Sequence, residues 1–184
     1  MQYQQQDVMP TKTLNELEKD IILFFVQNDL KNVELKVILD MYRAYQPIEI
    51  MESIMKLCRY GFFFLTREAT LTPDNYPLII QVVMRFKRQA TSYLLYYLVR
   101  QNSFAIRHSE PAVFDYKKVF CLPKQLEDRY IYKVYMLYYR QDHELWNAID
   151  ELKRKGYLIK IGKGKGKYRF RYELLPVELL KFLV

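Results

Sequence analysis

The sequence predicts an α+β fold, mainly α-helical with small β-hairpins, arranged as two similar units joined by a long central helix. Three observations predict this fold. Apolar residues recur at helical spacing along most of the chain. A basic, glycine-rich pattern typical of a β-hairpin occupies residues 153–171. A third observation is that one local pattern, a helix end followed by a strand, occurs twice.

Charge divides the chain into unequal halves. The 184 residues carry a net charge of +8. Residues 1–80 hold 8 Lys/Arg and 11 Asp/Glu, a net charge of −3, whereas residues 81–184 hold 21 and 10, a net charge of +11. A strongly basic half is typical of proteins that bind polyanions. We therefore expect the two halves to face different partners.

The composition also argues against membrane-spanning and secreted classes. No stretch reaches the roughly eighteen apolar residues that a membrane span requires. The N-terminus lacks the basic and then apolar pattern of a signal peptide. Cys58 and Cys121 lie in apolar surroundings and are expected to be free thiols, so we expect a reducing, intracellular compartment.

The chain is expected to begin with a flexible, glutamine-rich segment, residues 1–12. A helix should follow, because Thr13 and Glu16 form the T-x-x-E pattern in which two side chains cap the first amides. Apolar residues then recur at helical spacing until Asn28, where we expect this helix to end.

The rest of the first unit should contain two more helices and a hairpin. Apolar spacing predicts helices over residues 33–45 and 48–60, the second ended by Gly61. Two short strands are expected next, with a turn near Arg67. The first unit is therefore expected to span residues 13–77.

A broad apolar stripe at helical spacing predicts the central helix over residues 78–102. This helix has three alternative roles: the first helix of the second unit, a rigid spacer, or the seam of a dimer. Tyr93, Tyr96 and Tyr97 add more apolar area than one small unit needs to cover. We therefore expect a homodimer, formed through the central helix or the first unit.

The second unit is expected to occupy residues 103–184. Apolar residues at 104–106 and 113–114 are compatible with strands. Helices are predicted from Gln125 to Tyr139 and from Asp142 to Lys155. The apolar C-terminal stretch LLPVELLKFLV should pack on the core or on a partner.

The hairpin at residues 153–171 carries nine cationic residues and no acid. Glycines 162, 164 and 166 lie at its tip, where they would let the backbone approach a phosphate closely. The lysines that alternate with these glycines would share one face if strand geometry continued to the tip. The alternative is an ordinary surface hairpin whose lysines only keep the protein soluble.

The repeated pattern is I-x-x-L-x-R-x-G-aromatic, in residues 54–62 and again, 95 positions later, in residues 149–157. The match extends backwards without a gap to Met41 and Met136. Physically, the pattern describes a helix that buries one face, a glycine at its C-terminus, and an aromatic residue that starts a strand. Two similar units explain this recurrence, although the same local solution could also have been reached twice.

This combination of helix end, glycine and basic hairpin resembles the third helix and wing of winged-helix proteins. The resemblance covers residues 13–77 and 124–176. It implies two tandem winged-helix units, as in transcription regulators, basal transcription subunits and chromosome-segregation adaptors. It also implies double-stranded DNA as the partner, with the third helix in the major groove and the wing along the backbone. The tyrosine-rich, glycine-poor composition further resembles small proteins of thermophilic archaea and their viruses or plasmids.

Two kinds of DNA contact are expected from the second unit. Asn and Arg side chains pair with base edges, and the first turns of a recognition helix usually reach them. Asp150 and Glu151 on the same outer face would repel phosphate unless they lie above a base or pair with Arg154. Base recognition by this helix is therefore a separate expectation from phosphate contact by the hairpin. The candidate DNA-binding residues are His143, Asn147, Arg154, Lys155, Lys160, Lys163, Lys165, Lys167, Arg169 and Arg171.

The corresponding face of the first unit has a different composition. It comprises Glu49, Glu52, Met55, Lys56 and Arg59, and its hairpin is short and neutral. Two acids at the start of a helix make a poor surface for DNA. We expect this unit to contact protein or to form the dimer, or else only to support the second unit.

Enzymatic interpretations are weakly supported. The glycines at the hairpin tip lack the spacing of a phosphate-binding loop. The histidines and cysteines lack metal-ligand spacing. The fragment from Asp115 to Lys117 matches the D-x-K of some nucleases, with Glu110 as the nearest second carboxylate. We expect no catalytic residue, metal or cofactor.

The favoured function is a DNA-binding transcriptional regulator in the cytoplasm, associated with the nucleoid. The alternative is a non-enzymatic adaptor subunit of a transcription or chromosome complex, whose winged helices bind protein.

Overall fold

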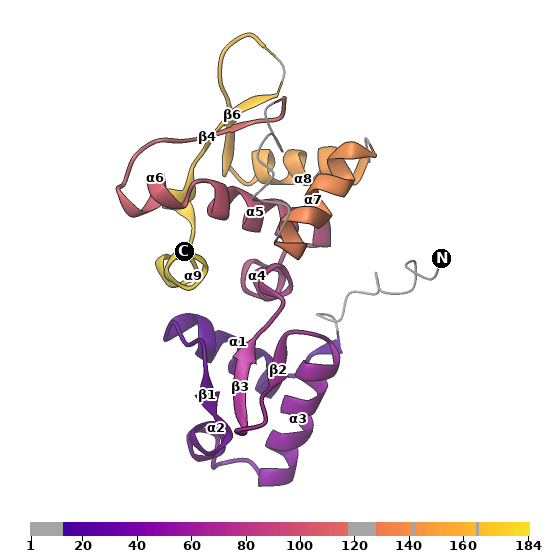
Figure 1. Ribbon diagram of the computed structural model, residues 1–184, viewed down its shortest axis with the longest axis vertical. Helices are drawn as coiled ribbons and strands as arrows, with labels where there is room; N and C mark the ends of the chain where they lie inside the picture. The colour runs from indigo at the N-terminus through magenta and orange to yellow at the C-terminus, as the bar shows by residue number, and fades with distance from the viewer. Residues whose placement is uncertain (1–12, 118–127, 141–142, 165) are drawn as a thin grey trace.

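The computed structural model describes residues 13–117, 128–140, 143–164 and 166–184. Within these ranges the chain is an α+β protein, with helices packed around two three-stranded antiparallel sheets (Figure 1). The predicted fold class, mainly helical with small sheets, is confirmed at this level.

The first half combines three helices with one small sheet. Its elements are α1 (Glu16–Gln27), β1 (Val33–Glu34), α2 (Leu35–Met41), α3 (Pro47–Arg59), β2 (Phe63–Leu65) and β3 (Thr70–Pro73). Strand β3 lies between β1 and β2, with Val33 opposite Leu71 and Phe64 opposite Thr72. The hairpin expected near Arg67 is therefore confirmed. The inward side chains of α1, α3 and the sheet share one hydrophobic core.

The N-cap of α1 is Asn15, and the expectation of Thr13 was wrong. The Asn15 side chain accepts a hydrogen bond from the Glu18 amide at 2.8 Å, and the Glu18 carboxylate accepts one from the Asn15 amide at 2.8 Å. Glu18 also accepts from the Lys56 ammonium at 3.1 Å. Asn is at least as good an N-cap as Thr, so the Asn15–Glu18 and Thr13–Glu16 patterns compete on similar terms. The additional hydrogen bond from Lys56 to Glu18 favours the Asn15–Glu18 pattern.

Val33 and Glu34 form a strand, although helical spacing predicted that they open a helix. They pair with β3, and the Leu35 amide donates to the Ala69 carbonyl at 2.9 Å. Val33 is buried and β-branched, and pairing with β3 satisfies backbone groups that the helix would have left to solvent. The partner strand is distant in sequence, so local spacing could not predict this strand.

The second half contains a second small sheet. Its elements are α4 (Tyr76–Met84), α5 (Gln89–Gln101), α6 (Ser103–Arg107), β4 (Ala112–Asp115), α7 (Arg129–Tyr139), α8 (His143–Arg154), β5 (Leu158–Lys160), β6 (Lys167–Phe170), the 3-10 turn η3 (Tyr172–Leu174) and α9 (Val177–Leu183). Strand β6 lies between β4 and β5. The strand expected at residues 113–114 is confirmed, whereas residues 104–106 belong to α6. The Ile106 amide donates to the Asn102 carbonyl at 2.9 Å, so the chain resumes a helix directly after α5.

The predicted starts of α7 and α8 both fall on residues that the structure does not describe. Asp128 caps α7, since its carboxylate accepts from the Tyr130 amide at 2.9 Å. The expected start at Gln125 and the expected Asp142 cap of α8 lie outside the part of the chain that the structure describes.

The single central helix was also a wrong expectation, because α4 and α5 are separate helices that pack against each other. Arg85 adopts a left-handed conformation with φ of 56° and ends α4. The Gln81 side-chain amide donates to the Phe86 carbonyl at 3.3 Å, which ties the turn back onto α4. Phe86 is itself buried, so the apolar spacing continues through the break and conceals it.

Helix α5 is enclosed within one chain. Every residue from Ala90 to Val99 is buried, and α4, α7, α8 and α9 pack around the helix. The surplus apolar area that suggested a dimer seam is therefore covered by the protein's own helices. In the order of elements, α5 precedes the strand, two helices and two strands of the second half, with α6 between α5 and the first of these strands.

The two halves repeat one order of elements. Among the described residues of each, a helix, a short strand, two helices and two strands follow in the same order, and the last strand lies in the centre of the sheet; the second half also contains α4, α6, η3 and α9. Gly61 and Gly156 end equivalent helices in the left-handed conformation, with φ of 86° and 84°. The amide after each glycine donates to the carbonyl five residues earlier, at 3.0 and 2.9 Å. The sequence repeat therefore corresponds to a repeated backbone structure.

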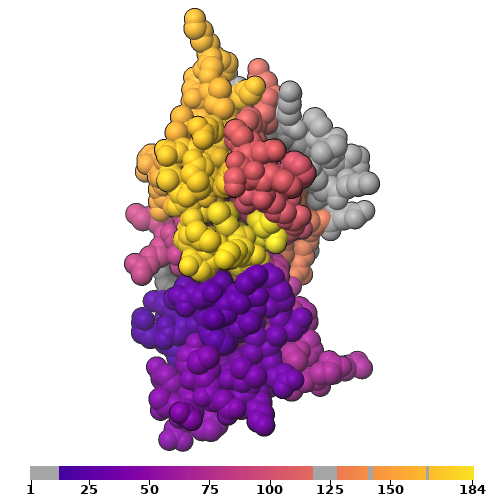
Figure 2. Space-filling model, turned by 90° about the vertical axis from the view of Figure 1, so that its left-hand side faces the viewer, coloured from indigo at the N-terminus to yellow at the C-terminus, as the bar shows by residue number. Residues whose placement is uncertain are grey.

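Helix α9 connects the halves by packing on both α1 and α5. Figure 2 shows this C-terminal segment, in yellow, seated on the indigo N-terminal half. The Phe182 ring is buried against Tyr76, with 5.3 Å between ring centroids, and the Lys31 ammonium lies 4.0 Å from its centroid. The prediction that the C-terminal stretch packs on the core is confirmed.

Cys58 is a free, partly buried thiol, as expected, and burial raises its pKa. Cys121 lies outside the described residues. Over those residues, no helix is long and apolar enough to cross a membrane.

Candidate nucleic-acid interface

Helix α8 buries the face that its spacing predicted. Its inward side chains Leu145, Ala148, Ile149 and Leu152 belong to the core. On the outside, His143, Asp150 and Arg154 are exposed and Asn147 is partly buried. The candidate residues for base contact therefore lie at the surface, on the face away from the core.

Glu151 was wrongly placed on that outer face. It is 5% exposed, and its carboxylate accepts a hydrogen bond from the Thr91 hydroxyl of α5 at 2.6 Å. The Lys155 ammonium lies 3.9 Å from the same carboxylate. Glu151 sits at the margin of the apolar stripe, and α5 supplies the donor that makes its burial tolerable. One of the two acids expected to repel phosphate is therefore removed from the surface.

A surface hollow of about 340 Å³ brings Asn147 and Arg154 together. Arg88, Lys153 and Asp150 also line it. Sequence reasoning missed Arg88, because the stretch MRFKR was interpreted as the interior of a long helix. The cluster of cations in that stretch was the available signal.

The basic hairpin has paired strands at its base, but this strand geometry does not continue into its tip. Lys160 pairs with Tyr168, and the Ile161 amide donates to the Lys167 carbonyl at 2.9 Å. Gly162 and Gly166 then adopt φ of 70° and 89°, values outside strand geometry. Strand geometry, which was the condition for the lysines to share one face, therefore does not continue through Gly162 and Gly166.

The cations of the hairpin are placed as follows. Lys160, Lys163 and Lys167 are exposed. Lys165 lies outside the described residues. The close approach of Tyr116 to the hairpin requires glycine at position 166, since a Cβ there would lie 2.9 Å from the Tyr116 Cβ. The Tyr116 ring in turn packs against Tyr138 and Trp146, at centroid distances of 4.9 and 4.4 Å.

Arg169 and Arg171 are less available than the sequence suggested. Glu173, two residues beyond the acid-free stretch, lies 3.9 Å from Arg169 and 3.5 Å from Arg171. Arg169 lies on the outer sheet face, opposite Val113 and Ile159 in register. Partial pairing of this kind at an exposed site is weak, so both arginines retain charge for a polyanion.

Lys155 is directed toward the α4–α5 turn. Its ammonium lies 4.9 Å from the centroid of the buried Phe86 ring. The Lys153 ammonium, which also lines the hollow with Arg88, lies 5.7 Å from the centroid of the Tyr168 ring in the hairpin. Burial and the nearby Asp150 carboxylate raise the pKa of Tyr168, which stays neutral at physiological pH. Helix α8 therefore lies between two cation-bearing neighbours.

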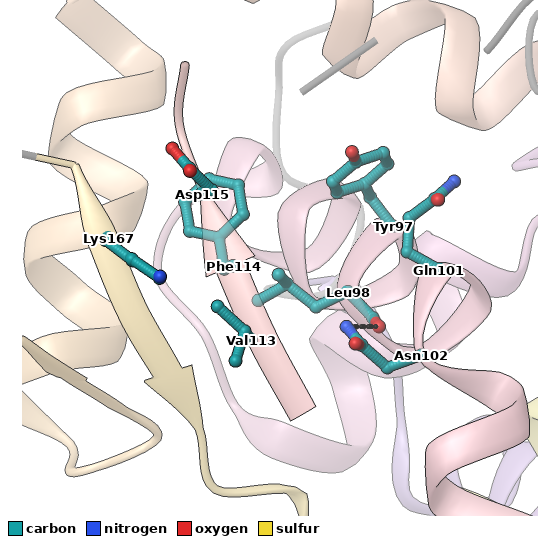
Figure 3. A pocket seen from close by; sticks show the side chains of 8 residues that line it. All are labelled: Tyr97, Leu98, Gln101, Asn102, Val113, Phe114, Asp115 and Lys167. Atoms are coloured by element: carbon teal, nitrogen blue, oxygen red, sulfur yellow. Dashed lines mark hydrogen bonds between the residues drawn. The ribbon is translucent and has the colours of Figure 1, made fainter. Parts of the chain in front are cut away.

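A second cavity, of about 420 Å³, lies between β4 and α5. Figure 3 shows Lys167 and Asp115 on its strand side, and Tyr97, Gln101 and Asn102 on its helix side. Asp115 is the carboxylate among its lining residues, and Glu110, the second acid that a D-x-K nuclease needs, does not line it. The Asp115 carboxylate instead accepts from the Lys117 amide at 3.0 Å. Among the described residues there is no group of three or more His, Cys, Asp or Glu side chains able to hold a metal.

The corresponding face of α3 differs as expected, with one correction. Glu49, Glu52, Met55 and Arg59 are exposed. Lys56 turns away, toward the start of α1, where it binds the buried Glu18 carboxylate and the Thr13 carbonyl at 2.9 Å. The exposed part of this face therefore keeps both acids and has only one cation, Arg59.

The chain matches no known family model, no curated protein and no solved structure.

Proposed function

We propose that this is a non-enzymatic DNA-binding protein built from two tandem winged-helix units, acting as a transcriptional regulator at the nucleoid. In this proposal α8 enters the major groove of duplex DNA. The hairpin formed by β5 and β6 is the wing and contacts the backbone. Phosphate contacts position the protein, and side chains of α8 read the bases.

One observation supports the proposal most directly. The half that carries the exposed cations of the hairpin is the half with the net charge of +11, and its elements follow the winged-helix order of helix, strand, two helices and two strands. Its cations lie on and beside α8 and the hairpin, where the winged-helix arrangement would place DNA. The burial of Glu151 also removes one acid from that surface.

Two measurements on the full chain test this proposal. Selection from a pool of random-sequence duplexes should recover a preferred sequence. Affinity for random duplex should fall steeply as salt rises from about 0.05 to 0.2 M, because each neutralised phosphate releases counterions. Absence of salt-dependent duplex binding would overturn the proposal.

An adaptor function is the second candidate, and apolar exposure on the first half favours it. Exposed apolar side chains on α2, α3 and β2 are Val37, Met41, Ile48, Met55, Phe64 and Leu65. Scattered apolar residues are common on surfaces, but several on neighbouring elements are typical of protein contacts. Salt-dependent binding without any preferred sequence would favour the adaptor over the regulator.

The first half is also where we propose that a second copy binds, since α5 is enclosed within the chain. Light scattering of the full chain should then give the mass of a dimer. Replacing Ile48, which is 67% exposed, by Glu should give the mass of a monomer without loss of fold.

A further inference from the structure

The turn between α4 and α5 is the most cationic segment outside α8 and the hairpin. We call residues 85–88 the linker. Arg85, Lys87 and Arg88 are exposed, and no acid occurs between Asp74 and Glu110. The fourth linker residue, Phe86, is 3% exposed. Because Phe86 is anchored in the core, the cations on both sides of it are held at the surface.

The linker lies against the C-terminal turn of α8. Lys155 reaches the linker directly through its contact with the Phe86 ring. Arg88 shares the 340 Å³ hollow with Asn147, Lys153 and Arg154. Cations from two segments that are distant in sequence therefore converge on one side of α8.

The chemistry of this hollow suits a phosphodiester. Two guanidinium groups offer fork-shaped pairs of donors that match phosphate oxygens, and an ammonium adds charge. Asn147 offers a neutral donor. Asp150 is the opposing charge, so the lining groups Arg88, Lys153, Arg154 and Asp150 leave an excess of two positive charges.

We propose that the linker is a second DNA-backbone site, separate from the wing, in which Arg88 with Lys153 and Arg154 holds one phosphate and Arg85 and Lys87 contact its neighbours. This inference rests on the proposed function. It adds Arg85, Lys87, Arg88 and Lys153 to the interface and makes the connection between the halves part of it. A duplex lying along α8 would then be held at the linker as well as at the wing.

The test uses the full chain and a labelled random-sequence duplex. The variant Arg85→Gln/Lys87→Gln/Arg88→Gln removes the linker charges while keeping long, polar side chains. Each lost phosphate contact should reduce the slope of log affinity against log salt by about 0.9, so we expect a reduction of roughly 2 to 3 units and at least roughly tenfold weaker binding at low salt.

The matched control is Lys36→Gln/Arg43→Gln/Arg67→Gln. It removes the same charge from exposed positions in the first half. Its slope should remain that of the unmodified protein. An equal loss in this control would mean that only total charge matters, and it would overturn the linker site.

A second variant tests the hollow by removing a negative charge instead of positive charges. Asp150→Asn removes the acid and should strengthen binding several-fold at low salt, with an unchanged melting temperature, since Asp150 is exposed. Unchanged affinity in both Asp150→Asn and the linker variant would overturn the linker site. If a variant of the wing lysines still lost binding, the proposed function would stand. No salt-dependent binding by the unmodified chain would overturn both.

Discussion

Single glycines determine the shape of the basic hairpin. Gly166 combines a left-handed φ of 89° with a Cβ position 2.9 Å from the Tyr116 Cβ, whereas a Cβ on Gly164 would meet nothing within 4 Å. Spacing in the sequence identified both glycines equally as tip residues. It could not separate them, because the difference comes from Tyr116, which directly follows the distant strand β4.

Gly166→Ala should therefore destabilise the fold by about 1–3 kcal/mol, the usual cost of a left-handed non-glycine residue, and toward the upper end because Tyr116 must also move. Gly164→Ala is the control and should change stability far less. Urea unfolding of both variants measures the difference. Equal costs would contradict the close approach of Tyr116.

At the wing, the triple variant Lys163→Ala/Lys165→Ala/Lys167→Ala should flatten the salt slope by up to roughly 3 units and weaken binding to all duplexes alike. Replacing Asn147 by Ala should instead alter sequence preference and leave the slope almost unchanged, because base contacts specify rather than position. Duplex selection and salt titration of both variants separate the two effects. An unchanged slope in a folded triple variant would remove the wing from the mechanism.

At the scale of elements, local signals predicted structure well and distant contacts did not. The glycine-capped ends of α3 and α8 and both hairpins follow from neighbouring residues. The burial of Glu151 depends on α5, a helix from elsewhere in the chain, whereas the break at Arg85 was concealed because the buried Phe86 continues the apolar spacing. The same limit applies to the candidate site. Asn147 and Arg154 followed from helical spacing, whereas their neighbour Arg88 is brought to them by the turn that the sequence concealed.

Packing between helices also predicts how stability depends on pH. Burial, with hydrogen bonding and repulsion from Asp128, raises the pKa of Tyr96, which donates to Asp128 at 2.6 Å. Burial and Asp74 raise the pKa of Tyr130, and burial and Asp20 raise that of Tyr42 to about 12. The folded state therefore holds these protons more tightly than the unfolded state. Their stabilisation is complete below the unfolded pKa of about 10 and is lost as pH rises through the folded values.

We therefore expect the melting temperature to fall above about pH 10. Tyr96→Phe should cost about 1.5–3 kcal/mol at neutral pH, because it removes a hydrogen bond to a carboxylate, and should make the alkaline decline shallower. Tyr139→Phe, at a position 70% exposed, is the control. Thermal melts followed by circular dichroism across pH 8–12 provide the test. An equally steep decline in Tyr96→Phe would exclude Tyr96 as a major contributor.

At the scale of the whole molecule, α9 determines whether the two halves behave as one body. Its Phe182 ring is 1% exposed and packs against the Tyr76 ring, and the Lys31 ammonium lies over both rings. Among the described elements, the last helix in the sequence thus packs on the first. Apolar spacing predicted that this helix would pack, but not that it would join the halves.

Phe182→Ala should lower stability by about 3–5 kcal/mol and uncouple the halves, because it leaves a cavity where they meet. Scanning calorimetry should show one unfolding transition for the unmodified protein and two for the variant. Val177→Ala, on the same helix at a position 60% exposed, should retain one transition. A single transition in Phe182→Ala would mean that other contacts suffice to couple the halves.

The two hairpins differ in length at one place only. Phe63 and Leu158, which open them, are 95 positions apart, but Thr70 and Lys167, which open the return strands, are 97 apart. The second hairpin therefore has two additional residues between its strands, where glycine and lysine alternate. The first hairpin can therefore be compared directly with the second within one protein. The first hairpin pairs its strands in the same order without these two residues, so strand pairing alone does not require them.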